Sequence, residues 1–197
     1  MRRIAVTICS LLPSAIRRFV LAAIAVTFMF VAMPGAARAA TITVQSTLDD
    51  TNPGHCTLRE AINSANGAAD TGTCTAGTGN DTIRFSVTGT IVLISTLPAV
   101  ANTLTITGPT TSGGIAIVGD HSVELMVLNS GATLNLQFLT MEDGSVTGSG
   151  FPGNGDGGAI YNNGTLTVAN STFSGNQATG GSGGNNTGGQ RRRRSHL

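Results

Sequence analysis

The stretch GDHSVE places three side chains capable of acid–base chemistry within five residues: Asp120, His121 and Glu124. A histidine between carboxylates can exchange protons near neutral pH or bind a metal ion. The same residues are also ordinary in a solvated turn between two strands. We expect the turn, with acid–base chemistry or a metal site as the alternative, and we predict no catalytic residue, no metal and no cofactor.

A glycine-rich stretch and two asparagines give weaker chemical signals. GNGDGG (153–158) resembles calcium-binding glycine repeats, but it occurs once and lacks their GGxGxDxU spacing. Asn163 and Asn170 fit glycosylation acceptor sites. Asparagine also tolerates left-handed backbone in turns, and this is the simpler use for both residues.

Cys56 and Cys74 are the cysteines that follow the N-terminal apolar segment. Two cysteines in an exported chain predict one disulfide, which would stabilise the fold by about 3 kcal/mol. A metal-binding pair is the alternative, but no second Cys or His pair stands at ligand spacing.

Residues 1–39 are predicted to be an export signal cleaved near Ala39. Arginines precede the apolar run 19–33, and Ala37-Arg38-Ala39 provides the small-x-small pattern of a cleavage site. An uncleaved membrane anchor is the alternative, although the apolar run is short for a bilayer span. The protein is therefore expected to be secreted or located at the cell surface.

The charge after residue 39 argues against nucleic acid as a partner. All ten acidic residues lie in this part together with six of the eleven arginines, so its formal charge is −4. Four of those six arginines form the run 191–194, and only Arg59 and Arg84 lie in the body. A nucleic-acid surface would need a basic patch.

A short amphipathic helix is predicted over 57–66. Thr57 and Glu60 have the spacing of a capping box, and Asn66-Gly67 provides a C-terminal stop. The apolar stripe has helical spacing: Leu58, Ala61, Ile62 and Ala65. A helix this short is unstable alone and must lie on an apolar surface.

The remaining chain consists of short segments rich in β-branched residues, bounded by Gly, Asn, Asp or Pro. After Cys74 no helical pattern that could form a βαβ crossover follows any of them. The predicted strands are 41–44, 82–87, 90–94, 103–107, 115–118, 123–128, 133–139, 159–161 and 165–173.

The last of these predicted strands lie in a sequence repeat. Residues 129–150 match 162–183 at a shift of 32, with one extra residue in the turn of the first copy, and 101–108 is a fainter third copy. Fixed-period short strands with Asn/Gly turns predict stacked layers that share one core. The fold class is therefore predicted as all-β, a parallel β-helix (solenoid) that is incomplete at its C-terminus. An ordinary sandwich is the alternative.

Two motifs carry a resemblance to known secreted proteins. CTLREAI (56–62) resembles the CSLREA motif of secreted bacterial proteins, with Thr57 where that motif has serine. The segment 157–178 is similar to the polymorphic outer-membrane repeat, which pairs a GGAI element with a downstream FxxN. The matching residues are Gly157, Gly158, Ala159, Ile160, Phe173 and Asn176.

The resemblance implies a right-handed parallel β-helix in an exported adhesin or autotransporter passenger, with no catalytic residue carried over. The partner would be a host, matrix or glycan surface. The helix 57–66 would then act as a lid over the first layer, or would dock on a side face and leave the end to strand 41–44. A β-helix lyase or hydrolase acting on acidic glycans is the rival function.

The predicted organisation is a signal peptide (1–39), an N-terminal cap (40–81), parallel layers (82–180) and a Gly/Asn-rich and Arg-rich disordered tail (181–197). The arginine run, Arg191 to Arg194, differs in composition from the body. We expect it to reflect a truncated gene or a shifted frame, with a basic recruitment tail as the alternative. An uncovered C-terminal strand edge would favour self-association.

Overall fold

The computed structural model describes residues 39–51, 54–67, 73–111, 113–148 and 155–181. The predicted signal segment up to residue 38, the arginine run and residues 153–154 of the glycine-rich stretch lie outside the described residues. Within these ranges the protein consists of short strands and one short helix. The predicted all-β class is therefore confirmed at the level of strand content and parallel pairing.

The strands fall at short intervals along the chain. They are β1 (Thr41–Val44), β2 (Asn80–Phe85), β3 (Gly89–Val92), β4 (Thr103–Thr107), β5 (Ile115–Val118), β6 (Met126–Leu128), β7 (Thr133–Gln137), β8 (Thr140–Glu142), β9 (Ser145–Thr147), β10 (Ile160–Asn162), β11 (Thr165–Ala169), β12 (Thr172–Ser174) and β13 (Gln177–Thr179). The helix α3 (Leu58–Ala65) lies between β1 and β2 in sequence.

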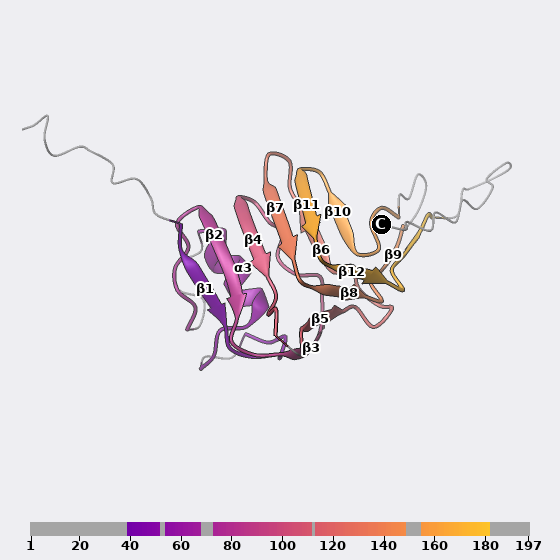
Figure 1. Ribbon diagram of the computed structural model, residues 1–197. Coiled ribbons are helices and arrows are strands. Elements are labelled where there is room, and N and C mark those ends of the chain that lie inside the picture. Colours follow the sequence, from indigo (N-terminus) through magenta and orange to yellow (C-terminus); the bar gives the residue numbers. More distant parts are fainter. Residues whose placement is uncertain (1–38, 52–53, 68–72, 112, 149–154, 182–197) are drawn as a thin grey trace, which may run out of the picture. The chain divides into compact units, whose positions relative to one another are not determined.

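All strand pairings are parallel. A five-stranded sheet has the order β1-β2-β4-β7-β11, and a four-stranded sheet has the order β12-β8-β5-β3. Two smaller sheets pair β10 with β6 and β13 with β9. Figure 1 shows the five-stranded sheet with its strands in this order.

The chain visits these sheets in a repeating order. β6, β7, β8 and β9 each lie in a different sheet, and β10, β11, β12 and β13 then visit the same four sheets in the same order. We call β10–β13 the last layer and β6–β9 the preceding layer. Because each strand pairs with its counterpart in the other layer, the two layers share one continuous core.

The register confirms the repeat that the sequence predicts. Thr133 pairs with Thr165, and Thr140 pairs with Thr172, both at a shift of 32. Leu128 pairs with Asn162, however, so the turn before β7 is two residues longer than the turn before β11. The sequence alignment placed only one extra residue there. It matched the asparagines at the start of each turn, whereas backbone pairing fixes the true register.

Three predicted strands have the predicted bounds, 41–44, 103–107 and 115–118. The predicted strand 123–128 is shorter, because the Val123 N–H donates to the Gly119 carbonyl and extends the preceding turn. The predicted strand 165–173 is two strands, since Asn170 has left-handed backbone with a φ of 52° and turns the chain between β11 and β12.

The bounds of the remaining predicted strands differ from the observed ones by at most two residues at either end. The observed bounds are Asn80–Phe85 for 82–87, Gly89–Val92 for 90–94, Thr133–Gln137 for 133–139 and Ile160–Asn162 for 159–161. Sequence reasoning also missed β8, β9 and β13. Each has only three residues, too few to show alternation.

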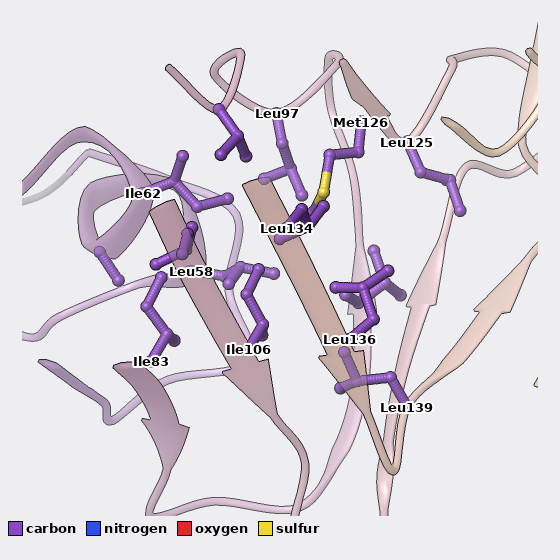
Figure 2. Packing of buried hydrophobic residues seen from close by; sticks show 14 of the residues in the cluster. Leu58, Ile62, Ile83, Leu97, Ile106, Leu125, Met126, Leu134, Leu136 and Leu139 are labelled. Carbon is purple, nitrogen blue, oxygen red and sulfur yellow. The ribbon is translucent and has the colours of Figure 1, made fainter. Parts of the chain in front are cut away.

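Alternation places the apolar residues of the five-stranded sheet on one face. One inward row runs through all five strands: Ile42, Ile83, Ile106, Leu136 and Val168. Side chains from the other sheets and from α3 complete the core, and Figure 2 shows Leu58 and Ile62 of the helix on the same side as Ile83 and Ile106.

Candidate functional site

The outward face of the five-stranded sheet is a regular polar surface. We call it the Thr/Asn face, and it consists of three rows that cross the strands. Its middle row is Thr41, Thr82, Thr105, Asn135 and Thr167. The first flanking row is Asn80, Thr103, Thr133 and Thr165, and the second is Thr43, Arg84, Thr107, Gln137 and Ala169.

Sheet geometry sets the spacing of this face. Parallel strands repeat at about 4.8 Å, and every second residue along a strand at about 6.6 Å, so the side chains form a grid. They are exposed or half-buried, and the Asn135 amide lies 3.4 Å from the Thr105 hydroxyl. Among the three rows only Arg84 is charged.

The chemistry of the Thr/Asn face is that of a binding surface. Hydroxyls and amides both donate and accept hydrogen bonds, and the threonine methyl groups add apolar contact. The alternation of apolar and polar residues along each strand places threonine and asparagine on the outward face. It did not predict continuous rows, because which residues become neighbours depends on pairing between strands some 30 residues apart.

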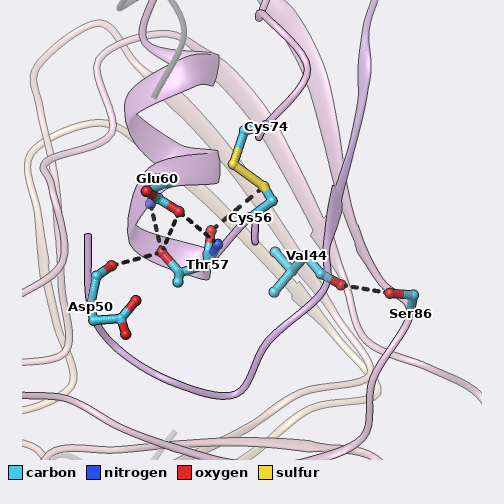
Figure 3. The surroundings of a disulfide bond; sticks show 7 residues. All are labelled: Val44, Asp50, Cys56, Thr57, Glu60, Cys74 and Ser86. Atoms are coloured by element: carbon cyan, nitrogen blue, oxygen red, sulfur yellow. Dashed lines mark hydrogen bonds between the residues drawn. A yellow bond between two sulfur atoms is a disulfide. The ribbon is translucent and has the colours of Figure 1, made fainter. Parts of the chain in front are cut away.

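The predicted disulfide is present between Cys56 and Cys74. It lies beside the start of α3, and Figure 3 shows the two cysteines next to Thr57 and Glu60. Cys56 and Cys74 are both buried. The bond therefore ties the residue before the helix N-cap to the segment that leads into β2.

The capping box predicted from Thr57 and Glu60 is also present. The Glu60 N–H donates to the Thr57 hydroxyl at 3.2 Å, and the Thr57 N–H donates to the Glu60 carboxylate at 3.0 Å (Figure 3). The predicted apolar stripe of the helix is buried throughout, as Leu58, Ala61, Ile62 and Ala65. These residues stabilise the fold by packing and capping.

The helix packs against β1 and β2 on one side and against residues 95–102 on the other. Its C-cap residue Asn66 donates to the Ala99 carbonyl at 2.8 Å and accepts from the Ala101 N–H at 2.9 Å. β1 keeps the edge position in the five-stranded sheet. The helix therefore packs on β1 and β2, while β1 itself forms the edge of the sheet at this end. That the helix acts as a lid over the first layer stays a prediction.

A buried ion pair that the sequence did not predict holds the helix in place. Asp49 accepts two hydrogen bonds from Arg59, at 2.8 and 2.7 Å, and a third from the Ile94 N–H. Arg59 also donates to the carbonyls of Ser95 and Thr96. Removing either charge would leave the other buried without its partner, which is costly.

Asp81 satisfies backbone groups near the start of β2. Burial disfavours its ionisation, but hydrogen bonds from the N–H groups of Ala40, Gly79 and Thr78 and from the Thr78 hydroxyl outweigh this and lower its pKa. This carboxylate is therefore a structural acceptor that links β1 to the turn before β2.

The repeat-motif residues serve the stacking of the layers. Asn176 accepts from the Gly144 N–H at 2.8 Å and donates to the Met141 carbonyl at 3.0 Å, so it bridges the last two layers. Phe173 pairs with Met141 in register.

The GGAI element lies against backbone. A side chain at Gly158 would collide with the backbone of Gln177, and one at Gly157, which has a φ of 78°, with that of Ile160 and Tyr161. Ala159 is buried and Ile160 is half-buried. These motif positions therefore require small or apolar residues for packing.

The GDHSVE stretch divides into two parts. Asp120 and His121 lie in an exposed turn with left-handed backbone, closed by the Ser122 N–H on the Gly119 carbonyl. The turn expected there is therefore present, and the His121 ring lies 3.6 Å from the Asp143 carboxylate rather than beside Glu124.

Glu124 differs from its neighbours. It is half-buried, and its Oε1 atom has no hydrogen-bond partner among the described residues. Burial, with a smaller contribution from the nearby charge of Asp156, raises its pKa to about 7. Sequence reasoning grouped Glu124 with the turn, and no local signal shows that this carboxyl turns inward.

A groove in the described part of the chain lies apart from the GDHSVE residues, although the carboxylates Asp49 and Asp50 are in its lining. This shallow groove of about 380 Å³ lies between residues 47–50 and β3, with Leu48, Val92 and Ile94 in its lining. Glu124, Asp156 and His121 are not among its lining residues. Within the same described ranges, no group of three His, Cys, Asp or Glu side chains could hold a metal ion.

Comparisons with known proteins add no assignment: no family model, curated protein or solved structure matches this chain. Of the described helices, none has the length and apolarity needed to cross a membrane.

Proposed function

We propose that this protein is an exported, non-catalytic parallel β-helix that serves as a surface or secreted adhesin or structural passenger. The observation that carries the proposal is the Thr/Asn face, a regular and nearly uncharged array of hydroxyls and amides over five paired strands. A surface of this kind can bind an extended polar ligand along its length.

The repeated visiting order of the sheets supports the β-helix. The last two layers run through four sheets in one order, and all pairings are parallel. Parallel crossovers are right-handed in nearly all proteins, so the proposed helix is right-handed. The resemblance of 56–62 and 157–178 to secreted bacterial repeat proteins points in the same direction.

Export is supported by the disulfide and by the predicted signal. Disulfides persist in oxidising compartments, and Cys56–Cys74 is buried within the fold. We propose cleavage near Ala39, which leaves a chain that begins just before β1. N-terminal sequencing of the exported protein should therefore start next to this position, and retention of residues 1–38 would contradict it.

The binding proposal is tested by changing the Thr/Asn face without changing its shape. The variant carries Thr82→Val, Thr105→Val and Thr167→Val, which remove hydroxyls from the middle row and keep the β-branched form. A matched control carries Thr140→Val and Thr172→Val, which are paired threonines in the four-stranded sheet. Binding is measured on a panel of immobilised matrix proteins, host-cell surfaces and neutral glycans.

We expect the parent chain and the control to bind at least one surface on the panel, and the face variant to lose most of that binding. Equal binding by all three proteins would contradict the assignment of the face. Absence of binding across the panel, together with turnover of a glycan, would overturn the proposed function itself.

Glu124 supports the alternative function, a β-helix lyase or hydrolase acting on acidic glycans. A carboxyl with a pKa of about 7 can act as a general acid or base at neutral pH. The acidic body, with Arg59 and Arg84 as its cations, would repel an acidic sugar, and Arg59 is engaged by Asp49. Incubation with pectin and detection of unsaturated products tests this alternative, and product formation that Glu124→Gln abolishes would establish it.

A further inference from the structure

The last layer leaves apolar side chains in solvent that the preceding layers bury. In the inward row of the five-stranded sheet, Ile106 and Leu136 are fully buried, whereas Val168 is 42 % exposed. Leu166 and Phe173 are half-buried, whereas their partners Leu134 and Met141 are fully buried. β11 therefore presents an apolar inner row that another strand could cover.

The free edge of β11 carries a defined set of backbone groups. The Thr165 N–H donates to Ala132, and the Ala169 carbonyl accepts from Phe138, so the odd-numbered residues direct their polar groups toward β7. Parallel strands alternate these directions. The N–H and C=O groups of Leu166 and Val168 thus point away from β7, where no described strand pairs with them.

Nothing in the sequence of the last layer discourages pairing at this edge. Residues 157–181 contain no charged residue and no proline, whereas the body before them carries all ten acids. Proteins commonly protect exposed strand edges with charges, prolines or bulges. The uncharged edge can therefore approach an identical edge without repulsion.

We propose that the edge of β11 pairs with the same edge of a second copy of this chain, antiparallel and across a two-fold axis at Thr167. In this register Leu166 of one copy lies opposite Val168 of the other, and the two residues exchange both backbone hydrogen bonds. Their side chains meet on the inner face. Thr167 lies opposite its own counterpart as a non-hydrogen-bonded pair on the outer face.

Two neighbouring registers are less favourable. An axis at Val168 would place Leu166 opposite Asn170, whose left-handed backbone is not extended. An axis at Leu166 would place Val168 opposite Gly164, whose N–H already donates to the Asn162 side chain at 3.0 Å. Only with the axis at Thr167 do the backbone N–H and C=O groups of both Leu166 and Val168 form hydrogen bonds with extended residues of the other copy.

A head-to-tail contact with β1 fits less well than the two-fold contact. Among the described residues, the end at β1 carries α3 and has no counterpart for β10 or β13. Such a contact would also continue into an open filament, whereas a two-fold contact closes as a dimer. The proposed partner is therefore one further copy, joined at its last layer.

A cysteine at the axis tests the register. Opposite residues of a non-hydrogen-bonded pair have Cα atoms about 4.5 Å apart, within the range that a disulfide spans. In a Cys9→Ser background, the Thr167→Cys chain should form a covalent dimer under mild oxidation. Thr165→Cys should not do so alone, but should cross-link when mixed with Ala169→Cys.

The cross-linking experiment also has outcomes that overturn the proposal. A Thr167→Cys chain that stays monomeric would contradict the two-fold contact, as would equal cross-linking by Thr165→Cys alone. A mixture of Thr167→Cys with Thr43→Cys that cross-links instead would show the head-to-tail contact with β1.

A charge at the same position provides an independent test. Thr167→Lys places two like charges opposite each other and should weaken the dimer by roughly tenfold or more in sedimentation equilibrium. Thr43→Lys, the matched change on the exposed outer face of β1, should leave the dimer unchanged. Equal weakening by both variants, or a parent chain that is monomeric at all concentrations, would refute the proposal.

Discussion

The apolar core is covered differently at the two ends of the five-stranded sheet, the β1 end and the β11 end. At the β1 end the inward residues Ile42 and Val44 are fully buried, because α3 packs against β1 and β2. At the β11 end the equivalent row finishes in Val168, which is 42 % exposed. The same alternation of apolar and polar residues runs through both ends, so the difference lies in what covers them.

The difference shows that a row of apolar residues does not close a stack of parallel strands by itself. The β1 end has a dedicated device: a capped amphipathic helix, a disulfide and the Asp49–Arg59 ion pair. The last layer has short turns and Asn176, which bonds to the layer beneath it. Four predictions test this comparison.

The largest expected effect on the free energy of unfolding is a difference between two residues of the inward row. Leu136→Ala should lower the free energy of unfolding by about 3 kcal/mol, because it opens a cavity in the core. Val168→Ala, at the paired position of the last layer, should cost less than about 1 kcal/mol, since this side chain is already partly in water. Urea unfolding at a protein concentration low enough to keep the chain monomeric measures both, and equal losses would show that Val168 is covered within the monomer.

The Cys56–Cys74 disulfide, at the β1 end, should contribute nearly as much to the free energy of unfolding as the Leu136 side chain does. Replacing Cys56 and Cys74 by alanine should cost about 3 kcal/mol, since the bond joins residues 18 positions apart and restricts the unfolded chain. The circular-dichroism spectrum should keep its strand character, because the layers beyond β4 do not depend on this bond. Thiol titration of the oxidised full chain should find only Cys9, and two further reactive thiols would contradict the pairing.

The capping box of α3 should contribute less to the free energy of unfolding than the disulfide does. Thr57→Ala removes the hydroxyl that accepts from the Glu60 N–H, and should cost about 1 to 2 kcal/mol in thermal or urea unfolding. Thr57→Ser keeps the hydroxyl and serves as the control. If the serine variant loses as much stability as the alanine variant, packing of the threonine methyl group stabilises the helix start more than capping does.

The smallest expected effect on stability is the pH dependence caused by Glu124, which lies before β6. Its pKa of about 7 in the folded protein is above the ordinary value of 4.5, so the folded state binds the proton more tightly. Stability should therefore fall as pH rises from 4.5 to 7 and stay lower above that range. Because the side chain is only half-buried, screening by solvent should keep the loss below about 1 kcal/mol.

Glu124→Gln should remove this pH dependence and make the protein more stable than the parent at pH 8. Glu142→Gln, which removes one carboxyl charge at a half-buried residue of β8, serves as the control for the loss of a charge. Unfolding midpoints measured from pH 4 to pH 8 provide the comparison. A profile that Glu124→Gln leaves unaltered would show that the carboxyl is solvated in solution.

The sequence by itself determined the features that rest on short-range geometry. Thr57 and Glu60 are three residues apart, and this spacing alone brings each side chain to the other's backbone N–H. The strands 41–44 and 103–107 follow from an alternation of period two, which shows which face is apolar. The repeat showed which strands would pair, although not the length of every turn.

Only the tertiary structure decided the features that depend on neighbours distant in sequence. The rows of the Thr/Asn face, the Asp49–Arg59 pair and the inward position of Glu124 exist because the backbone brings separate segments together. Three-residue strands such as β13 are defined by their hydrogen-bond partners in the layer beneath. Burial and pairing are properties of the assembled sheets, and no local pattern of residue types contains them.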